Sequence, residues 1–198
     1  MDSDMMQKKD AEPRRIHIDI RDATEKDLKG IVELWEMLVE QHRTYSDHFA
    51  IARGGRRKWA RYLRQKFTER STKLIVAEEE GELMGFMMCL LSPQESIFAE
   101  KATGVVSDAF VRKDRRKKGV MKEMLRVALR WFDKNKMKSV EVSVAAANLE
   151  ARAAWGQLGF KPFLVRKRLQ LDKFHAQLLL NGTAPKKVVR KKKSSGKL

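Results

Sequence analysis

The segment of this 198-residue chain that is best suited to chemistry is a short basic turn between a predicted strand and a predicted helix. Residues 104–111 are mostly apolar, and the next eight residues, RKDRRKKG, carry six cationic side chains and one acid and end at Gly119. The first N–H groups of a helix lack internal partners and lie at the positive end of its dipole, so such a turn binds phosphate readily. A glycine lets the backbone approach the anion closely. The turn therefore suits a pyrophosphate, although it matches neither GxxxxGK[ST] nor GxGxxG.

A second segment, Asn148 to Phe160, follows directly after a predicted strand over residues 140–144, where valine alternates with polar residues. Asn148 is suited to cap the helix that follows, and Gly159 marks where that helix has ended. The chain therefore has a second strand-to-helix connection, after the one at the basic turn.

Together the two segments resemble the GNAT N-acetyltransferase superfamily. Its phosphate-binding pattern, Q/R-x-x-G-x-G/A, is matched in its first two fixed positions by Arg116 and Gly119. Its later pattern, N-x-x-A-x-x-x-Y-x-x-x-G-F, is matched at Asn148, Ala151, Gly159 and Phe160. The opening IRDATEKDLKGIVELW is similar to the first strand and helix of this superfamily, and the resemblance covers residues 16–171.

The resemblance implies an α/β (α+β) fold in which about four helices flank a mixed, mostly antiparallel sheet of six to seven strands, split in a V between the fourth and fifth strands. Acetyl-CoA, the co-substrate, would lie in that split. An acceptor with a primary amine would attack the thioester directly, with no covalent enzyme intermediate. The residues implied to bind acetyl-CoA are Ala109, Phe110, Val111, Arg116, Lys117, Lys118, Gly119, Val120, Met121 and Asn148.

Two positions depart from the family pattern. Met121 replaces the second small residue of the phosphate turn, although its backbone N–H is retained. Trp155 stands where a tyrosine usually protonates the departing thiolate, and an indole is not an acid near neutral pH. General acid help is worth about 10²–10⁴-fold, so its loss would slow turnover without abolishing it. Either water supplies the proton, or Trp155 packs against the pantetheine and favours binding over chemistry.

Asp108, three residues before the end of the fourth predicted strand, is the candidate base that takes a proton from the amine. Acyltransferases of the polyamine-acetylating kind carry an acid there, and the alternative is a structural carboxylate that bonds a neighbouring loop. Ser143 stands where some members place a glutamate base, and Glu141 on the same strand is a more distant carboxylate. His48 lies in a loop that contacts acceptors in this superfamily, where an exposed histidine without a role is the alternative.

Apolar periodicity predicts the remaining elements. We expect strands at 16–20, 74–77, 83–91, 104–111 and 140–144, helices at 28–42, 55–69, from 119 and from 148, a last strand pair or one bent strand at 160–171, and a short helix at 173–180.

The net charge of +17 is concentrated in three segments. Residues 53–73 carry nine cationic side chains and one acid, and residues 112–118 carry six cationic side chains and one acid. Residues 181–198 carry seven cationic side chains and no acid. The basic helix near the acceptor side argues against a polycationic acceptor and for an acidic or phosphorylated one. The tail is either a solvated extension or a contact for nucleic acid or a ribosome.

The length predicts one domain over residues 16–180, with a disordered leader at 1–15 and a disordered basic tail at 181–198. Cys89 is the single cysteine, so an internal disulfide is excluded and a cytoplasmic location is favoured. No apolar run approaches the ~20 residues of a membrane span. The four histidines lack metal-ligand spacing, so we expect no metal.

Two functions follow. The first is an acetyl-CoA-dependent N-acetyltransferase, as a monomer or homodimer, that acts on an unidentified amine. The alternative is an acyl-CoA-binding module of the same fold with weak or no turnover, which associates with nucleic acid through its basic tail.

Overall fold

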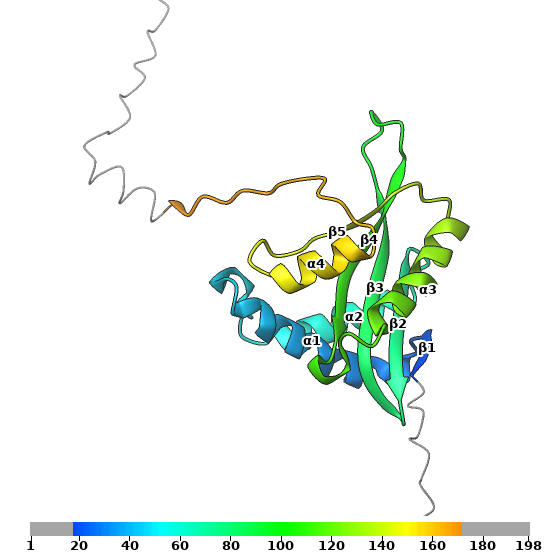
Figure 1. The fold of residues 1–198 in the computed structure, drawn as a ribbon, viewed down its shortest axis with the longest axis vertical. Helices are drawn as coiled ribbons and strands as arrows, with labels where there is room; N and C mark the ends of the chain where they lie inside the picture. Colours follow the sequence, from blue (N-terminus) through cyan, green and yellow to red (C-terminus); the bar gives the residue numbers. More distant parts are fainter. Residues whose placement is uncertain (1–17, 172–198) are drawn as a thin grey trace, which may run out of the picture. The chain divides into compact units, whose positions relative to one another are not determined.

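The computed structural model describes residues 18–171 (Figure 1). The predicted leader, the predicted helix at 173–180 and the basic tail at 181–198 lie outside the described residues. The chain divides into two units, Met1–Phe160 and Lys161–Leu198. All the strands of the described residues belong to the first unit.

The strands and α-helices of the first unit follow the order β-α-α-β-β-β-α-β-α, which matches the order predicted from the apolar periodicity of the sequence. Its strands are β1 (Asp19–Asp22), β2 (Thr72–Glu79), β3 (Glu82–Pro93), β4 (Ala102–Val111) and β5 (Val140–Val142). Its α-helices are α1 (Leu28–Arg43), α2 (Gly55–Lys66), α3 (Val120–Lys134) and α4 (Leu149–Gln157). Three single turns of 3-10 helix connect them: η1 (Glu25–Asp27), η2 (Asp47–Phe49) and η3 (Lys113–Arg115).

The five strands of the described residues form one sheet in the order β1-β2-β3-β4-β5, in which only β4 and β5 are parallel. The mixed, mostly antiparallel sheet and its four flanking helices are confirmed, but the expected six to seven strands are not found within residues 18–171. The prediction of strands at 160–171 is wrong, because residues 161–170 form no helix or strand. Phe163, Leu164 and Val165 are exposed, so no buried face stabilises a strand in this segment.

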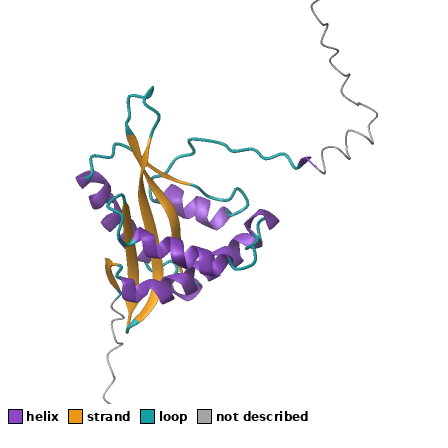
Figure 2. Cartoon of the chain, turned by 180° about the vertical axis from the view of Figure 1, so that it is seen from behind, coloured by secondary structure: helices purple, strands orange, loops and turns teal. Residues whose placement is uncertain are grey.

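Two apolar clusters cover the two faces of the sheet. One contains α3 residues such as Met124 and Phe132 with Ile75 and Val106 of the sheet. The other contains residues of α1 and α2, such as Ile31 and Leu63, with sheet residues such as Phe86 and Phe110. Helices α1 and α2 therefore pack on one face and α3 on the other, as Figures 1 and 2 show.

Arg21 fixes the start of α1 against the sheet. Its guanidinium donates two hydrogen bonds of 2.8 Å to the Asp27 carboxylate and a further bond of 2.9 Å to Glu78 on β2. The hydrogen bond from Arg21 lowers the pKa of Asp27 to about 2. The start of α1 is therefore held to β1 and β2 by charge-assisted bonds.

A β-bulge in β4 changes which face its residues occupy. Met88 pairs with Asp108 and Cys89 with Val106, so Ser107 is the extra residue. Val106 belongs to the α3 cluster whereas Phe110, four residues later, belongs to the α1/α2 cluster. Without the bulge the two side chains would share a face, because side chains alternate with period two. The bulge therefore places Asp108 on the α1/α2 face with Phe110.

Within residues 18–171, no helix is long and apolar enough to cross a bilayer. In the same residues, no three His, Cys, Asp or Glu side chains lie where they could together hold a metal ion.

Candidate functional site

The parallel pairing of β4 and β5 ends well before β4 does. The two strands pair over three positions, from Gly104 with Val140 to Val106 with Val142, and β4 then continues to Val111. Along residues 107–111, the edge of β4 that faces away from β3 has no strand partner among the described residues. The expected opening between the fourth and fifth strands is therefore present, and it begins at the bulge. Its unpaired edge offers backbone N–H and C=O groups to an extended amide-bearing ligand.

The turn after β4 exposes a row of backbone N–H groups. Lys117 and Gly119 both have left-handed backbones, with φ of 61° and 82°. A Cβ atom at Gly119 would meet nothing within 4 Å, so the glycine is required by its backbone angle and not by lack of space. Over the part of the chain that the structure describes, the N–H groups of residues 117–121 donate to no other residue. Such a nest of amides at the start of α3 suits an anion.

Three of the six cations that the sequence places in this turn, Arg112, Arg115 and Arg116, are held in ion pairs. Arg115 Nε donates to Glu79 Oε2 over 2.5 Å and its Nη1 donates to Asp114 over 2.8 Å. Glu79 is buried, and its other oxygen, Oε1, has no partner among the described residues. The hydrogen bond that Arg115 donates to Glu79 raises the pKa of Arg115. Arg115 therefore anchors the turn to the end of β2 and is not a mobile charge.

Arg116 joins the turn to three other parts of the molecule. Its guanidinium donates to the Val111 carbonyl (3.1 Å), to Gln41 Oε1 on α1 (2.7 Å) and to Glu150 Oε2 on α4 (3.1 Å). It also lies over the Phe110 ring, 5.7 Å from the centroid. The backbone N–H of Arg116 donates to Lys113, at 3.4 Å. Arg116 is thus a fixed bridge across the opening, and within residues 18–171 only Lys113, Lys117 and Lys118 of the six cations have no ion-pair partner.

Asn148 caps α4 as predicted. Its Oδ1 accepts a hydrogen bond of 3.0 Å from the Ala151 N–H. The residue is buried, but its Nδ2 atom still reaches solvent and donates to no described residue. One half of the side-chain amide therefore holds the helix, while the other half is available to a ligand.

Trp155 is a core residue. Only 8% of it is exposed, and its ring packs edge-on against Phe160 with centroids 5.1 Å apart. It belongs to the apolar cluster of α3. The tight end of α4 explains this contact, because the Phe160 N–H donates to the Trp155 carbonyl over 3.0 Å.

Asp108 and Ser107 lie together opposite Met88 at the bulge. Burial raises the pKa of the Asp108 carboxyl, and a hydrogen bond with Ser107 opposes that shift. The Ser107 hydroxyl also donates to the Met88 carbonyl over 3.2 Å. A partly buried carboxylate with a raised pKa at the mouth of an opening is suited to accept a proton. Glu141 lies within β5, and Ser143 directly follows Val142, at which β5 and its pairing with β4 end.

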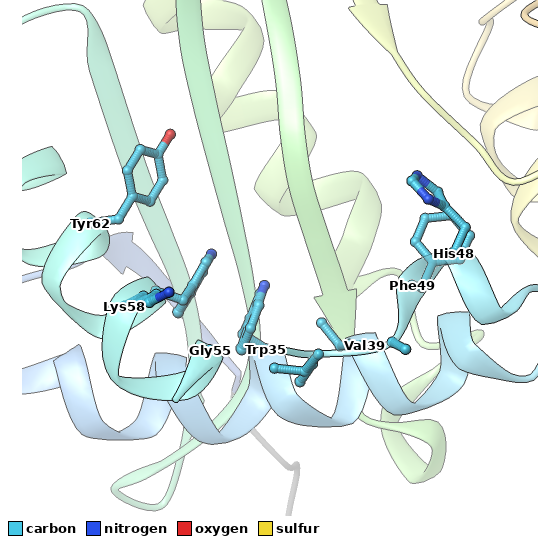
Figure 3. Close-up of a pocket in the computed structure, with 10 residues that line it drawn as sticks. Trp35, Val39, His48, Phe49, Gly55, Lys58 and Tyr62 are labelled. Atoms are coloured by element: carbon cyan, nitrogen blue, oxygen red, sulfur yellow. The ribbon is translucent and has the colours of Figure 1, made fainter. Parts of the chain in front are cut away.

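A pocket of about 440 Å³ lies between α1, η2 and α2, on the side of the sheet that carries Asp108 (Figure 3). His48, Phe49 and Lys58 line it with three rings of α1 and α2, namely Trp35, Trp59 and Tyr62. The residue patterns pointed to His48 and to the basic helix separately, and nothing in the sequence shows that Trp35 and Trp59, which lie on two different helices, meet. Gln41, Glu79 and Glu150 were also missed, because each acts through a partner far away in the sequence.

Comparisons with known proteins agree with this geometry. Residues 29–160 match the model of the acetyltransferase (GNAT) family. An uncharacterized N-acetyltransferase of Archaeoglobus fulgidus is 29% identical over 135 residues, which are 68% of this chain and 87% of that protein. One of Bacillus subtilis is 26% identical over 144 residues, 73% of this chain and 90% of that protein.

Solved structures share the fold at low identity. The aminoglycoside N-acetyltransferase AAC(6')-Iy in complex with CoA has a TM-score of 0.64 at 17% identity, over 80% of this chain and 100% of that one. A ribosomal-protein-alanine N-acetyltransferase from Brucella melitensis has a TM-score of 0.58 at 15% identity, over 78% of this chain and 99% of that one.

Cys89 lies inside the central strand β3, fully buried, and burial raises the pKa of its thiol to about 12. Because the thiolate is the reactive form, we expect the native protein to resist alkylation by iodoacetamide near pH 8, whereas the unfolded chain is alkylated at the rate of an ordinary thiol. Mass spectrometry of the native and urea-unfolded protein measures this. Rapid labelling of the native protein would show that Cys89 is accessible and would reopen it as a nucleophile.

Proposed function

Because the family model matches two thirds of its length, the chain belongs to the acetyltransferase (GNAT) family, and we propose that it transfers an acetyl group from acetyl-CoA to a primary amine by direct attack on the thioester. The observation that carries the proposal is the row of unpartnered amides at residues 117–121 beside the unpaired edge of β4. The first suits a diphosphate and the second suits the amide groups of a pantetheine arm.

The residues present fit acetyl-CoA. The amides of Lys117 to Met121 would bind the diphosphate, with the unpaired Lys117 and Lys118 adding charge. The backbone of Ala109, Phe110 and Val111 would pair with the pantetheine, and Asn148 Nδ2 would donate to it. Arg116, implied by the resemblance as a phosphate contact, would instead hold the two sides of the opening together.

Asp108 would act as the general base. It accepts the proton that the amine nitrogen loses as the new C–N bond forms and the C–S bond breaks, and the departing thiolate takes a proton from water. A raised pKa suits this role, because a base works best when its pKa lies near the working pH. A thiolate is a tolerable leaving group, since free thiols titrate near ~8.5.

The phosphate turn is tested by two matched glycine variants. Gly119 and Gly81 both have a left-handed backbone, and a Cβ atom at either position would meet nothing within 4 Å. Alanine at either position should therefore cost about 1–2 kcal/mol of unfolding free energy through backbone strain alone. We expect Gly119→Ala to weaken acetyl-CoA binding at least about fivefold in calorimetry, since the strained turn withdraws its amides, and Gly81→Ala to leave it unchanged. Equal affinities in the two variants would contradict the placement of the diphosphate.

The base is tested by Asp108→Asn. We expect kcat to fall by about 10²–10⁴-fold while the affinity for acetyl-CoA stays unchanged. Because the base works deprotonated, kcat/KM of the unmodified protein should rise with pH through the Asp108 pKa, which lies above the ordinary value of 3.8, and the variant should lose that rise. Asp133→Asn on α3 is the control for loss of one carboxylate. A variant that keeps full kcat would leave Asp108 a structural carboxylate.

The second candidate function is an acyl-CoA-binding module with little turnover. Trp155 favours it, because a buried indole stands where an acidic hydroxyl is usual and no proton donor replaces it there. It would associate with nucleic acid through the tail at residues 181–198, and that binding would weaken steeply with salt.

Trp155→Tyr separates the two functions. If the protein is an N-acetyltransferase, the unmodified protein already releases thiol from acetyl-CoA faster than buffer does when a panel of amines is supplied. Trp155→Tyr then changes that rate only modestly. In the second, the unmodified protein shows a Tm raised by CoA without turnover, and the tyrosine raises the rate by at least about tenfold. An unmodified protein with neither thiol release nor a CoA-dependent Tm would contradict both.

A further inference from the structure

The pocket between α1, η2 and α2 has an aromatic lining. Trp35 of α1 and Trp59 of α2 stack with centroids 4.5 Å apart and planes 10° apart. Figure 3 shows Tyr62 at one end of the pocket and His48 with Phe49 at the other, with Trp35 and Val39 between them. These side chains give the pocket a mostly aromatic lining, which suits an apolar side chain.

The aromatic wall rests on the strands that carry the candidate base. The Trp59 ring meets Phe86 edge-on, 6.3 Å between centroids, and Phe86 pairs with Phe110 across β3 and β4. Asp108 lies two residues before Phe110 on the same face, which is about 7 Å along the strand. Trp59 of the pocket is thus connected to Asp108 through Phe86 and Phe110, so a polypeptide can extend from the pocket along this face toward an amine placed at Asp108.

The outer side of α2 carries cations that no acid balances. The helix, GRRKWARYLRQK, contains no acidic residue, and in residues 18–171 only Arg56 and Lys66 of its cations form ion pairs, with Glu36 and Glu69. Lys58 lines the pocket, and Arg61 follows it by one helical turn. Like charges at this spacing repel, so the row of Arg57, Lys58, Arg61 and Arg64 is unfavourable to the helix by itself. An anionic ligand would relieve that repulsion.

The pocket is open to solvent, and Lys58 brings one of these cations to its exposed lining. His48, Ile51, Lys58 and Tyr62 are all exposed although they line it. An open pocket bordered by a row of charges suits the end of an extended chain better than a small molecule enclosed on all sides. The charges also disfavour a polycationic acceptor.

We propose that this pocket and the cations of α2 select an acidic polypeptide as the acceptor, with an apolar side chain next to the acceptor amine seated between Trp35, Trp59 and Tyr62. Acidic side chains further along the polypeptide pair with Lys58 and Arg61. The inference rests on the proposed function, because it names the acceptor of the same site. The amine is supplied either by the polypeptide's amino terminus or by a lysine, and the experiment distinguishes the two.

The test compares short peptides as acceptors for the full-length protein. The peptide FEEEE, with a free amino terminus, is compared with GEEEE, which lacks the apolar group, and with FRRRR, which reverses the charge. We expect kcat/KM for FEEEE to exceed both by at least about tenfold. An amino-terminally acetylated EEFKEE, whose lysine is its only primary amine, shows whether a lysine in the same surroundings is also accepted.

Variants assign the preference to the pocket. Lys58→Glu should raise KM for FEEEE about tenfold, because it replaces an attraction by a repulsion, while KM for acetyl-CoA stays unchanged. Tyr62→Ala should reduce the advantage of FEEEE over GEEEE. Arg130→Glu makes the same charge change on α3, on the opposite face of the sheet, and should leave all three peptides unaffected.

Binding is also measured without turnover. Titration of FEEEE should quench the fluorescence of the stacked Trp35 and Trp59 to saturation, and Lys58→Glu should weaken the titration. Saturation without acetylation of any amine would overturn the proposed function and leave the pocket inference standing. Acetylation in which FRRRR or GEEEE equals FEEEE, or a preference that Lys58→Glu does not change, would overturn the inference and leave the function standing.

Discussion

The arrangement of the site depends on the point at which β4 stops pairing with β5. Three residue pairs hold the strands together, and a bulge at Ser107 follows immediately. The bulge does two things at once, since it coincides with the end of the parallel pairing and turns Asp108 toward the α1/α2 face. A single extra residue thus brings an unpaired backbone edge and a partly desolvated carboxylate to the same place. Both halves of an acyl transfer, holding the donor and deprotonating the acceptor, would need this one irregularity.

The opening is held by charged side chains as well as by backbone geometry. Arg116 bonds to the end of β4, to Gln41 of α1 and to Glu150 of α4, and Arg115 bonds to the buried Glu79 at the end of β2. The turn between β4 and α3 is therefore fixed at its start, while the backbone N–H groups of residues 117–121 have no partners among the described residues. Bonds of this kind pre-organise a site, because the donor groups are positioned before a ligand arrives. The contact with Gln41 also connects the phosphate turn with the helix that lines the aromatic pocket.

Sequence reasoning could predict the local parts of this picture. The periodicity of 28–42 predicted α1, the cap at Asn148 predicted the start of α4, and Gly119 predicted the turn from which α3 begins. Sequence reasoning could not predict the bulge, because Val106, Asp108 and Phe110 have the parity of an unbroken strand. Only the register with β3 shows that Val106 lies on the face opposite to that of Asp108 and Phe110. Nor could it predict the fixed positions of the two arginines. Arg115 bonds to Glu79, 36 residues away, and Arg116 bonds to residues that are 34 and 75 positions away. The strands expected at 160–171 are absent because Phe163, Leu164 and Val165 stay exposed, and apolar content alone does not show whether a segment is buried.

Hydrogen–deuterium exchange of the protein with and without acetyl-CoA tests the central claim most directly, because it reports on individual backbone amides. If acetyl-CoA occupies the opening of β4, the amides of residues 107–111 and 117–121 should exchange more slowly in its presence, while the hairpin of β2 and β3 is unaffected. Saturating acetyl-CoA that protects neither segment, or that protects a different part of the chain, would contradict the account.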